Sequence, residues 1–154
     1  MAPVGKVERK LEVQISADDY YNLFKSQVYK LAHISSDIVQ KVELQEGCQW
    51  HTNGGVKSWN VIHEGKAISA KERMEIDDAS KSVTFNIIEG DMMKEFKSFK
   101  TTMQAVPKGD GEGCIANWCI EYEKLNENVP APISYLDTVE KLTRDIEAHL
   151  VSNA

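Results

Sequence analysis

The stretch that decides the fold is PISYLDTVEKLTRDIEAHLV, residues 132–151. Its apolar side chains recur every three or four residues and form one stripe: Ile133, Leu136, Val139, Leu142, Ile146 and Leu150. This spacing predicts an amphipathic helix of roughly twenty residues, about 30 Å long at about 1.5 Å per residue. Pro130 and Pro132 stand where this helix begins, because a proline in the first turn loses no helical hydrogen bond. The stripe needs a large apolar surface to pack against.

Upstream of this helix, most of the chain alternates apolar and polar residues, which predicts strands with one buried face. Seven segments have this pattern: residues 4–15, 38–44, 56–62, 67–76, 82–88, 95–106 and 114–123. Turn-forming residues separate most of them at hairpin length, so we expect an antiparallel sheet. Phe96 falls on the opposite phase from Phe99, which indicates a β-bulge near Ser98.

A helical stretch follows the first strand. Ser16 begins the sequence Ser-Ala-Asp-Asp, a variant of the capping box, and apolar residues keep helical spacing to about Ser35. The pair Ser26-Gln27 is a plausible joint that would divide this stretch into two short helices.

Together these elements predict an α+β domain in which a sheet of about seven strands curls with its twist around the long helix. One helix covers only part of a curled sheet. The uncovered apolar residues are then expected to line an internal cavity.

Composition narrows the function classes. The chain has 154 residues, 42% hydrophobic, which predicts a single globular domain over residues 1–154. Its formal net charge of −6 argues against nucleic-acid binding. No apolar run approaches the roughly 18 residues of a membrane span, and the first residues lack the apolar core of a signal peptide, so we expect a cytoplasmic protein. Cys48, Cys114 and Cys119 are expected to be reduced thiols, and no metal or cofactor is expected.

The order of elements, together with particular words in the sequence, resembles the plant major latex proteins of the Bet v I and pathogenesis-related class ten superfamily. The matching residues run through nearly the whole chain: Val4-Gly5-Lys6, Trp59-Asn60, His63-Glu64-Gly65-Lys66, Lys81 to Phe85, Ile88-Glu89-Gly90, Phe96 to Phe99, Val106 to Gly111, Trp118 with Glu121 to Lys124, and Pro130-Ala131-Pro132. The resemblance implies the helix-grip (START-like) fold: a seven-stranded curved antiparallel sheet wrapped on a long C-terminal helix, two short helices after the first strand, and an internal hydrophobic cavity.

The loop between the second and third strands departs from this pattern. In the superfamily it is glycine-rich and resembles a phosphate loop. Here Trp50 and His51 are bulky, and no Lys-Ser or Lys-Thr follows. Nucleotide binding is therefore not expected.

Ligand-contact candidates come from the inward phases of the predicted strands and helices. The strand candidates are Ile62, Ile68, Ala70, Met74, Val83, Phe85, Ile87, Phe99, Met103, Ala116 and Trp118. The helix candidates are Leu136, Val139 and Leu142, with Phe24 and Leu31 near the mouth of the cavity. Small Ala70 and Ala116 and flexible Met74 and Met103 favour a hollow over a filled core. Plain core packing explains any single one of these residues equally well.

Polar candidates to orient a ligand are Tyr135, Tyr122, Thr101 and Arg9, although tyrosine hydroxyls at a cavity edge commonly meet only water or backbone. The acids and bases that an enzyme could use are His33, His63, Glu72 and Asp91. His63 is expected to be solvated in its turn. Glu72 shares the phase of Ala70 and Met74, so its carboxyl is a weak candidate for a general base with a raised pKa. The competing interpretation is a glutamate paired with Lys or Arg at the rim.

Three functions remain open at this stage. The first is a carrier, store or sensor of a small hydrophobic or amphipathic plant metabolite or hormone, in defence or stress response. The second is an isomerase or cyclase of an alkaloid-like substrate in the same cavity. The third is a regulatory module whose loop at 47–55 or 89–94 docks a protein partner. A monomer or weak dimer is expected.

Overall fold

The protein is described from a computed structural model, which covers residues 4–45, 47–50, 54–109 and 113–152. The strands are β1 (Val4–Val13), β2 (Val39–Leu44), β3 (Val56–His63), β4 (Lys66–Asp77), β5 (Ser82–Gly90), β6 (Phe96–Pro107) and β7 (Cys114–Lys124). The helices are α1 (Ala17–Ser26), α2 (Leu31–Ile34) and α3 (Ile133–Ser152), with short 3-10 turns η1 (Val28–Lys30) and η2 (Asp91–Lys94). Residues 51–53 lie outside the described part, so the prediction about nucleotide binding stays a prediction.

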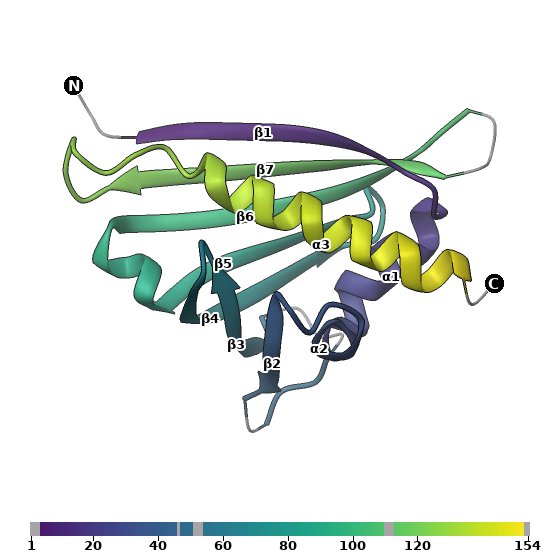
Figure 1. Ribbon diagram of the computed structural model, residues 1–154, viewed down its shortest axis with the longest axis horizontal. Helices are drawn as coiled ribbons and strands as arrows, with labels where there is room; N and C mark the ends of the chain where they lie inside the picture. The colour runs from purple at the N-terminus through teal and green to yellow at the C-terminus, as the bar shows by residue number, and fades with distance from the viewer. Residues whose placement is uncertain (1–3, 46, 51–53, 110–112, 153–154) are drawn as a thin grey trace.

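The seven strands form one antiparallel sheet in the order β1-β7-β6-β5-β4-β3-β2. Figure 1 shows α3 lying across one face of this sheet, with α1 and α2 beside its C-terminal half. The predicted α+β architecture, with a curved sheet around a C-terminal helix, is confirmed. The order of the strands explains the curvature, because β1 and β2 form opposite edges and each strand adds its twist to the last.

Local signals in the sequence set the ends of several elements. Ser16 caps α1, since its hydroxyl accepts a hydrogen bond from the backbone N–H of Asp19 at 3.1 Å. The helical stretch divides at Gln27, within the predicted joint. The register of β6 against β7 shifts between Phe96 and Ser98, which confirms the predicted bulge and lets both Phe96 and Phe99 be buried.

A second register shift lies between β4 and β5, beside Gly90. The backbone of Gly90 has φ 130° and passes so close to β4 that an added Cβ would lie 2.3 Å from the carbonyl oxygen of Ser69 and 2.7 Å from Cα of Ala70. Only glycine tolerates both this conformation and this contact. The close approach holds the middle of β4 against the end of β5.

Helix α1 packs on the ends of β5, β6 and β7 and fills that part of the concave face. Its contact centres on Tyr20, which is fully buried and whose hydroxyl lies 2.8 Å from Thr143 Oγ1. The indole N–H of Trp118 donates to the same hydroxyl at 3.1 Å. One tyrosine therefore joins α1, β7 and α3.

The change Tyr20→Phe is expected to lower the free energy of unfolding by about 2–3 kcal/mol, because it leaves the Trp118 N–H and the Thr143 hydroxyl buried without this partner. Urea unfolding followed by tryptophan fluorescence measures the change. Tyr29→Phe serves as the control. Tyr29 is 44% exposed, so removing its hydroxyl should change the free energy of unfolding by less than about 0.5 kcal/mol. Equal effects of the two substitutions would contradict the role assigned to Tyr20.

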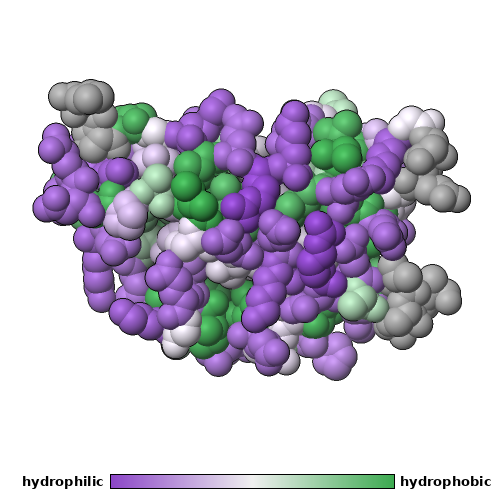
Figure 2. Space-filling model, turned by 45° about the horizontal axis from the view of Figure 1, so that its top comes forward, coloured by the Kyte–Doolittle hydropathy of each residue, from purple (hydrophilic) through white to green (hydrophobic). Residues whose placement is uncertain are grey.

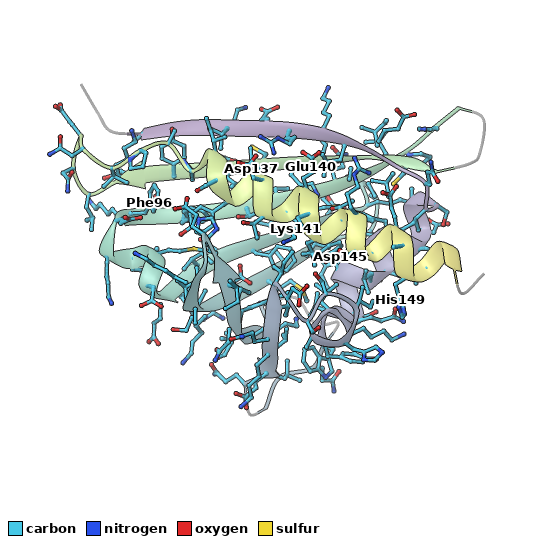
Figure 3. The ribbon with its side chains drawn as sticks, in the orientation of Figure 1. Phe96, Asp137, Glu140, Lys141, Asp145 and His149 are labelled. Atoms are coloured by element: carbon cyan, nitrogen blue, oxygen red, sulfur yellow. The ribbon has the colours of Figure 1, made fainter. Side chains whose placement is uncertain are left out.

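Polar contacts hold the rims of α3. Arg9 Nη1 lies 2.7 Å from Asp137 and 3.2 Å from Glu140, both on the side of α3 that faces β1 (Figure 3). On the other side, the hydroxyl of Ser35 donates to Asp145. Arg9 is thus tied to α3. It was named as a candidate to orient a ligand, but it does not line the cavity described below. These contacts position α3 over the sheet while leaving space beneath its N-terminal half.

The prediction that the apolar stripe of α3 faces the sheet is confirmed except at the start of the helix. Ile133 is 51% exposed, because it occupies the first helical position at the rim of the sheet. Thr143, which interrupts the stripe, is fully buried through its contact with Tyr20. Leu136, Leu142 and Ile146 are buried as predicted.

The outer surface carries mostly hydrophilic side chains. Figure 2 shows several separate hydrophobic areas on one face instead of a continuous patch. The large exposed apolar residues are Val4, Tyr29, Ile88, Val106, Leu125 and Ile133, which come from different elements. Within the described residues, none of the helices combines the length and apolarity that crossing a membrane requires.

Candidate binding cavity

An apolar cavity lies between the sheet and the N-terminal half of α3. It offers about 140 Å³ to the centre of a water-sized sphere. On this measure a single water needs about 10–15 Å³, so the space is large enough for a small organic molecule. The lining comprises Phe24, Ile38, Val39, Trp59, Val61, Ala70, Glu72, Phe85, Ile87, Met92, Phe99, Thr101, Trp118, Ile120, Tyr135, Thr138, Val139 and Leu142.

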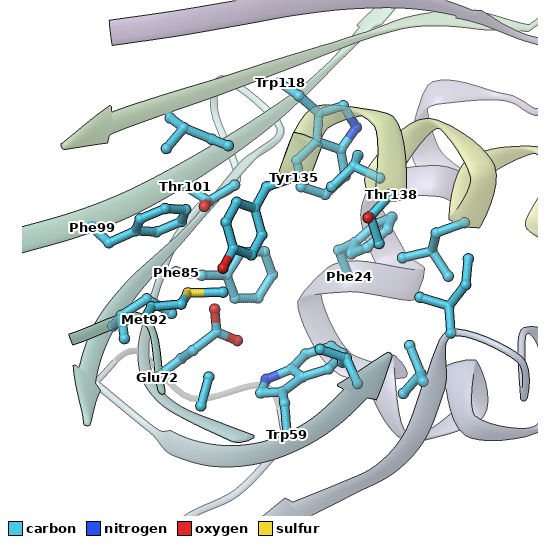
Figure 4. Close-up of a pocket in the computed structure, with 18 residues that line it drawn as sticks. Phe24, Trp59, Glu72, Phe85, Met92, Phe99, Thr101, Trp118, Tyr135 and Thr138 are labelled. Carbon is cyan, nitrogen blue, oxygen red and sulfur yellow. The ribbon is translucent and has the colours of Figure 1, made fainter. Parts of the chain in front are cut away.

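Aromatic rings form much of this wall (Figure 4). Phe24 meets Trp118 edge to face with ring centroids 5.3 Å apart, and Trp59 meets Phe85 at 6.3 Å. Phe99 contacts Tyr135 of α3 at 5.2 Å. Such contacts brace one another. The cavity is therefore bounded by rings that are fixed by packing on each other.

Several predicted contact residues lie on this wall. They are Phe24, Ala70, Phe85, Ile87, Phe99, Trp118, Tyr135, Val139 and Leu142. Thr101, named as a polar candidate, also lines it. Tyr122 does not, because it packs on Phe96 at 5.8 Å nearer the rim. Whether any of these residues contacts a ligand remains a proposal.

Other predicted contact residues are buried in solid core away from the cavity. They are Leu31, Met74, Val83, Met103, Ala116 and Leu136, each no more than 2% exposed. The prediction took the long C-terminal helix as the cover of part of the concave face and did not count α1 as a second cover. Helix α1 fills the half of that face where Val83, Met103 and Ala116 lie, and the methionines there fill core. The small residue that does border the hollow is Ala70.

The prediction for β3 chose the wrong face. Ile62 is absent from the cavity lining, whereas Trp59 and Val61 border it. Lys57 shares their phase and is only 1% exposed. The sequence left Trp59 ambiguous, because Ser58, Asn60 and Ile62 form the competing face of this strand, and the structure places Trp59 on the inner face.

A second pocket lies beside the first, between the β3–β4 turn, η2 and the start of α3. It is lined by Ile68, Phe96, Tyr135, Ser134, Pro130, Ala131, Pro132, His63, Glu64, Lys66, Asp91, Lys94 and Glu95. Ile68 was predicted to line the inner cavity, but it borders this outer pocket, because it lies near the start of β4 beside the β3–β4 turn. Tyr135 borders both spaces and forms the partition between them.

His63 was predicted to be solvated in its turn, and this prediction is wrong. It is 9% exposed, with Nδ1 3.0 Å from Thr138 Oγ1 and Nε2 3.1 Å from Ser134 Oγ. Its ring stacks on Tyr135 at 3.7 Å with 6° between the planes. Burial lowers the pKa of His63, so the neutral ring is favoured at pH 7. His63 therefore fixes the first turns of α3 and the Tyr135 partition.

The wall of the inner cavity carries one carboxyl group, that of Glu72. Its side chain projects into the cavity from β4, as Figure 4 shows. Burial raises the pKa of Glu72 to about 8, and the charge of Lys57 and the indole of Trp59 oppose this rise. At pH 7 the carboxyl is mainly uncharged. The predicted inward orientation is confirmed, and within the described part of the chain Glu72 makes no ion pair with a lysine or arginine at the rim.

In the register of β3 against β4, Lys57 lies directly opposite Glu72. Its Nζ lies 3.3 Å from Met74 Sδ and 5.8 Å from the centre of the Trp50 ring. Burial lowers the pKa of Lys57 to about 8, while Glu72 and Cys48 act in the opposite direction. Lys57 and Glu72 thus both have a pKa displaced to about 8, and of the two only Glu72 lines the cavity.

Sequence reasoning missed several lining residues for different reasons. Val61 was missed because the other face of β3 was chosen as the inner one. Met92 was missed because it lies in the short turn η2, which has no apolar periodicity to reveal it. Ile120 shares the inward phase of Trp118 on β7, so a signal for it was present in the alternation. Among the described residues, no three potential metal ligands lie together.

Comparison with known proteins gives a consistent picture. Residues 2–153 match the family described as "Pathogenesis-related protein Bet v 1 family". The chain is 39% identical to MLP-like protein 28 of Arabidopsis thaliana over 97% of its length and 37% identical to major latex protein 146 of Papaver somniferum, also over 97%. It spans 93% of the poppy protein but only 44% of MLP-like protein 28 and 47% of MLP-like protein 34.

Among solved structures, ginseng major latex-like protein 151 from Panax ginseng superposes with a TM-score of 0.89 at 37% identity, covering 95% of this chain and 97% of that one. Norcoclaurine synthase from Thalictrum flavum, in complex with dopamine and hydroxybenzaldehyde, superposes with a TM-score of 0.71 at 16% identity, covering 96% of this chain and 89% of the enzyme chain. The second likeness concerns the fold alone.

Proposed function

Because the chain belongs to the pathogenesis-related protein Bet v 1 family, with major latex proteins among its relatives, we propose that its inner cavity binds one small hydrophobic or amphipathic plant metabolite or hormone for carriage, storage or sensing. The observation that carries this proposal is an apolar cavity walled by aromatic rings beneath α3. Apolar ligands gain about 25 cal/mol for each Å² of surface that they bury, and a few polar groups orient them.

The cavity, and not the outer pocket, is the proposed site. The outer pocket mixes charges of both signs, with Lys66 and Lys94 beside Glu64, Asp91 and Glu95. A binding site for an apolar molecule needs walls that compete poorly for water, and the inner cavity has them. The outer pocket is separated from it by the Tyr135 ring.

A cavity-filling substitution tests the proposal. Ala70→Phe is expected to weaken binding of the neutral dye N-phenyl-1-naphthylamine at least about tenfold, because the added ring occupies the space the dye requires. Dye fluorescence on titration gives the dissociation constant. Ala67→Phe is the matched control on the same strand, where the side chain is exposed, and it should change the affinity less than about twofold.

Unchanged dye affinity in Ala70→Phe, with the fold intact by circular dichroism, would show that the dye binds elsewhere. Equal weakening by both substitutions would point to a general effect on the sheet. Either result would contradict the proposed site.

One observation favours a second candidate, an isomerase or cyclase acting in the same cavity. A carboxyl with a pKa raised to about 8, facing an apolar space, can exchange a proton with a bound substrate near neutral pH. On this alternative Glu72 is the general acid or base. Turnover of a candidate substrate that survives Glu72→Gln unchanged would rule out that mechanism.

A further inference from the structure

The indole N–H of Trp59 is a polar group on the cavity wall that the described structure leaves unsatisfied. Trp59 is 9% exposed and borders the cavity, and among the described residues its Nε1 makes no hydrogen bond of normal geometry, although it lies near enough to Glu72 to favour the charged form of that carboxyl. The other tryptophan on this wall differs, because Trp118 donates its N–H to Tyr20. Buried donors in folded proteins are nearly always paired. An unpaired donor on the wall of a cavity is a group with which a bound molecule can form a hydrogen bond.

A second hydrogen-bonding group lies next to this donor. Trp59 is paired with Ala70 across β3 and β4, and Glu72 follows Ala70 by two positions, so Glu72 and Trp59 are diagonal neighbours on the same face of the sheet. Figure 4 shows the indole nitrogen on the side of the ring toward Glu72, and the carboxyl of Glu72 projecting into the cavity. In its protonated form the carboxyl also donates a hydrogen bond.

Resting on the proposed function, we infer that the natural ligand is an apolar molecule with a neutral carbonyl or hydroxyl oxygen that accepts hydrogen bonds from Trp59 Nε1 and Glu72. An ammonium group cannot accept from the indole N–H. A carboxylate would lose its hydration in an apolar cavity and would face a second carboxyl group. A neutral oxygen has lone pairs for both donors, and moving it from water into the cavity costs less free energy than moving a carboxylate.

Two further titratable groups lie near Glu72, and one of them, Lys57, affects its protonation. Lys57 of β3 lies opposite it, and Tyr135 of α3 borders the same cavity. Lys57 in its charged form lowers the pKa of Glu72, and burial of the carboxyl outweighs this effect. The donor pair is accordingly expected to be complete at pH 6–7 and to lose the Glu72 proton as the pH passes about 8.

Four probes with one naphthalene skeleton separate the ligand classes: 2-acetylnaphthalene, 2-ethylnaphthalene, 2-naphthoate and 2-naphthylmethylammonium. Displacement of N-phenyl-1-naphthylamine gives each dissociation constant, with the dye's own affinity determined for every variant. Trp59→Phe is expected to weaken binding of the ketone about 5–10-fold, which corresponds to the loss of one hydrogen bond. The same substitution should change the affinity for the hydrocarbon less than about twofold. The amide of Glu72→Gln still donates a hydrogen bond, so this variant should bind the ketone at pH 7 as the wild type does. The wild type is expected to lose affinity for the ketone between pH 7 and pH 9, and Glu72→Gln should not.

Trp118→Phe is the matched control. Trp118 borders the cavity too, but its N–H is already bonded to Tyr20, so its loss should affect ketone and hydrocarbon equally. Equal effects of Trp59→Phe on both probes would overturn the inference while leaving cavity binding intact. Tightest binding by the ammonium probe at pH 7, abolished in Glu72→Gln, would also overturn it and assign a cationic ligand. Failure of the dye and of all four probes to bind would refute the proposed function itself.

Discussion

The wild-type protein is expected to lose stability as the pH rises from 5 to 8, and the Glu72→Gln variant is expected to lose much less. Glu72 titrates near 4.5 in the unfolded chain and at about 8 in the fold. Between these values the folded state holds a proton that the unfolded state has released. The free energy of unfolding therefore falls with pH, by at most about 1.4 kcal/mol per pH unit for one group.

The difference between the two proteins isolates Glu72 from other titrating groups. The lowered pKa of His63 acts the other way, since stability from this residue rises as the pH increases toward 6.5. That contribution is common to both proteins and cancels. Lys57, whose pKa is lowered to about 8, adds stability only as the pH rises from about 8 toward 10.5.

Urea unfolding at half-unit pH steps measures the effect. Stability of Glu72→Gln relative to the wild type should increase steadily from pH 5 to pH 8. Glu75→Gln is the control, because Glu75 is exposed on the same strand and lies outside the cavity. Parallel curves for the wild type and Glu72→Gln would mean that the carboxyl is solvated, contrary to its position in the structure.

The second large effect is expected from Phe24→Ala, which should lower the free energy of unfolding by about 3–5 kcal/mol. Phe24 is 1% exposed and contacts Tyr20 at 5.0 Å and Trp118 at 5.3 Å. It also borders the cavity, so the truncation enlarges the binding space instead of leaving an isolated void. We expect larger apolar ligands to bind this variant better than the wild type and to restore part of its lost stability.

Phe96→Ala provides the comparison. Phe96 is equally buried and packs on Phe99 at 5.1 Å, but it borders the outer pocket and not the inner cavity. Thermal unfolding with and without an apolar ligand distinguishes the two variants. Both should be destabilised, and only Phe24→Ala should change which ligand sizes bind. A loss below about 1 kcal/mol in Phe24→Ala would contradict the packing assigned to this ring.

The fold was predictable because local patterns and global architecture agree along nearly the whole chain. The stripe of α3, the alternation of the strands and the cap at Ser16 each require one arrangement, and the structure has it. Even the bulge in β6 was visible, since Phe96 and Phe99 cannot face the same way on a regular strand.

The cavity was predictable in kind but not in extent. Alternation identifies which residues face inward, yet it does not say which part of the inner face α1 covers. Met103 and Ala116 were expected on the cavity wall for this reason, and they belong to the filled half. Buried polar residues account for the other differences. Lys57 lies on the inner face of β3, which alternation of apolar and polar residues does not predict, and His63 was expected to be solvated because it sits in a turn.

The central claim is that an apolar molecule binds in the inner cavity beneath α3, and intermolecular NOEs from bound 2-acetylnaphthalene to the methyl groups of the protein test it most directly. The account predicts NOEs to Ile87, Ile120 and Leu142, which border the inner cavity from the sheet and from α3. NOEs confined to Ile68 of the outer pocket, or to the exposed methyl groups of Ile133 and Val106, would contradict it.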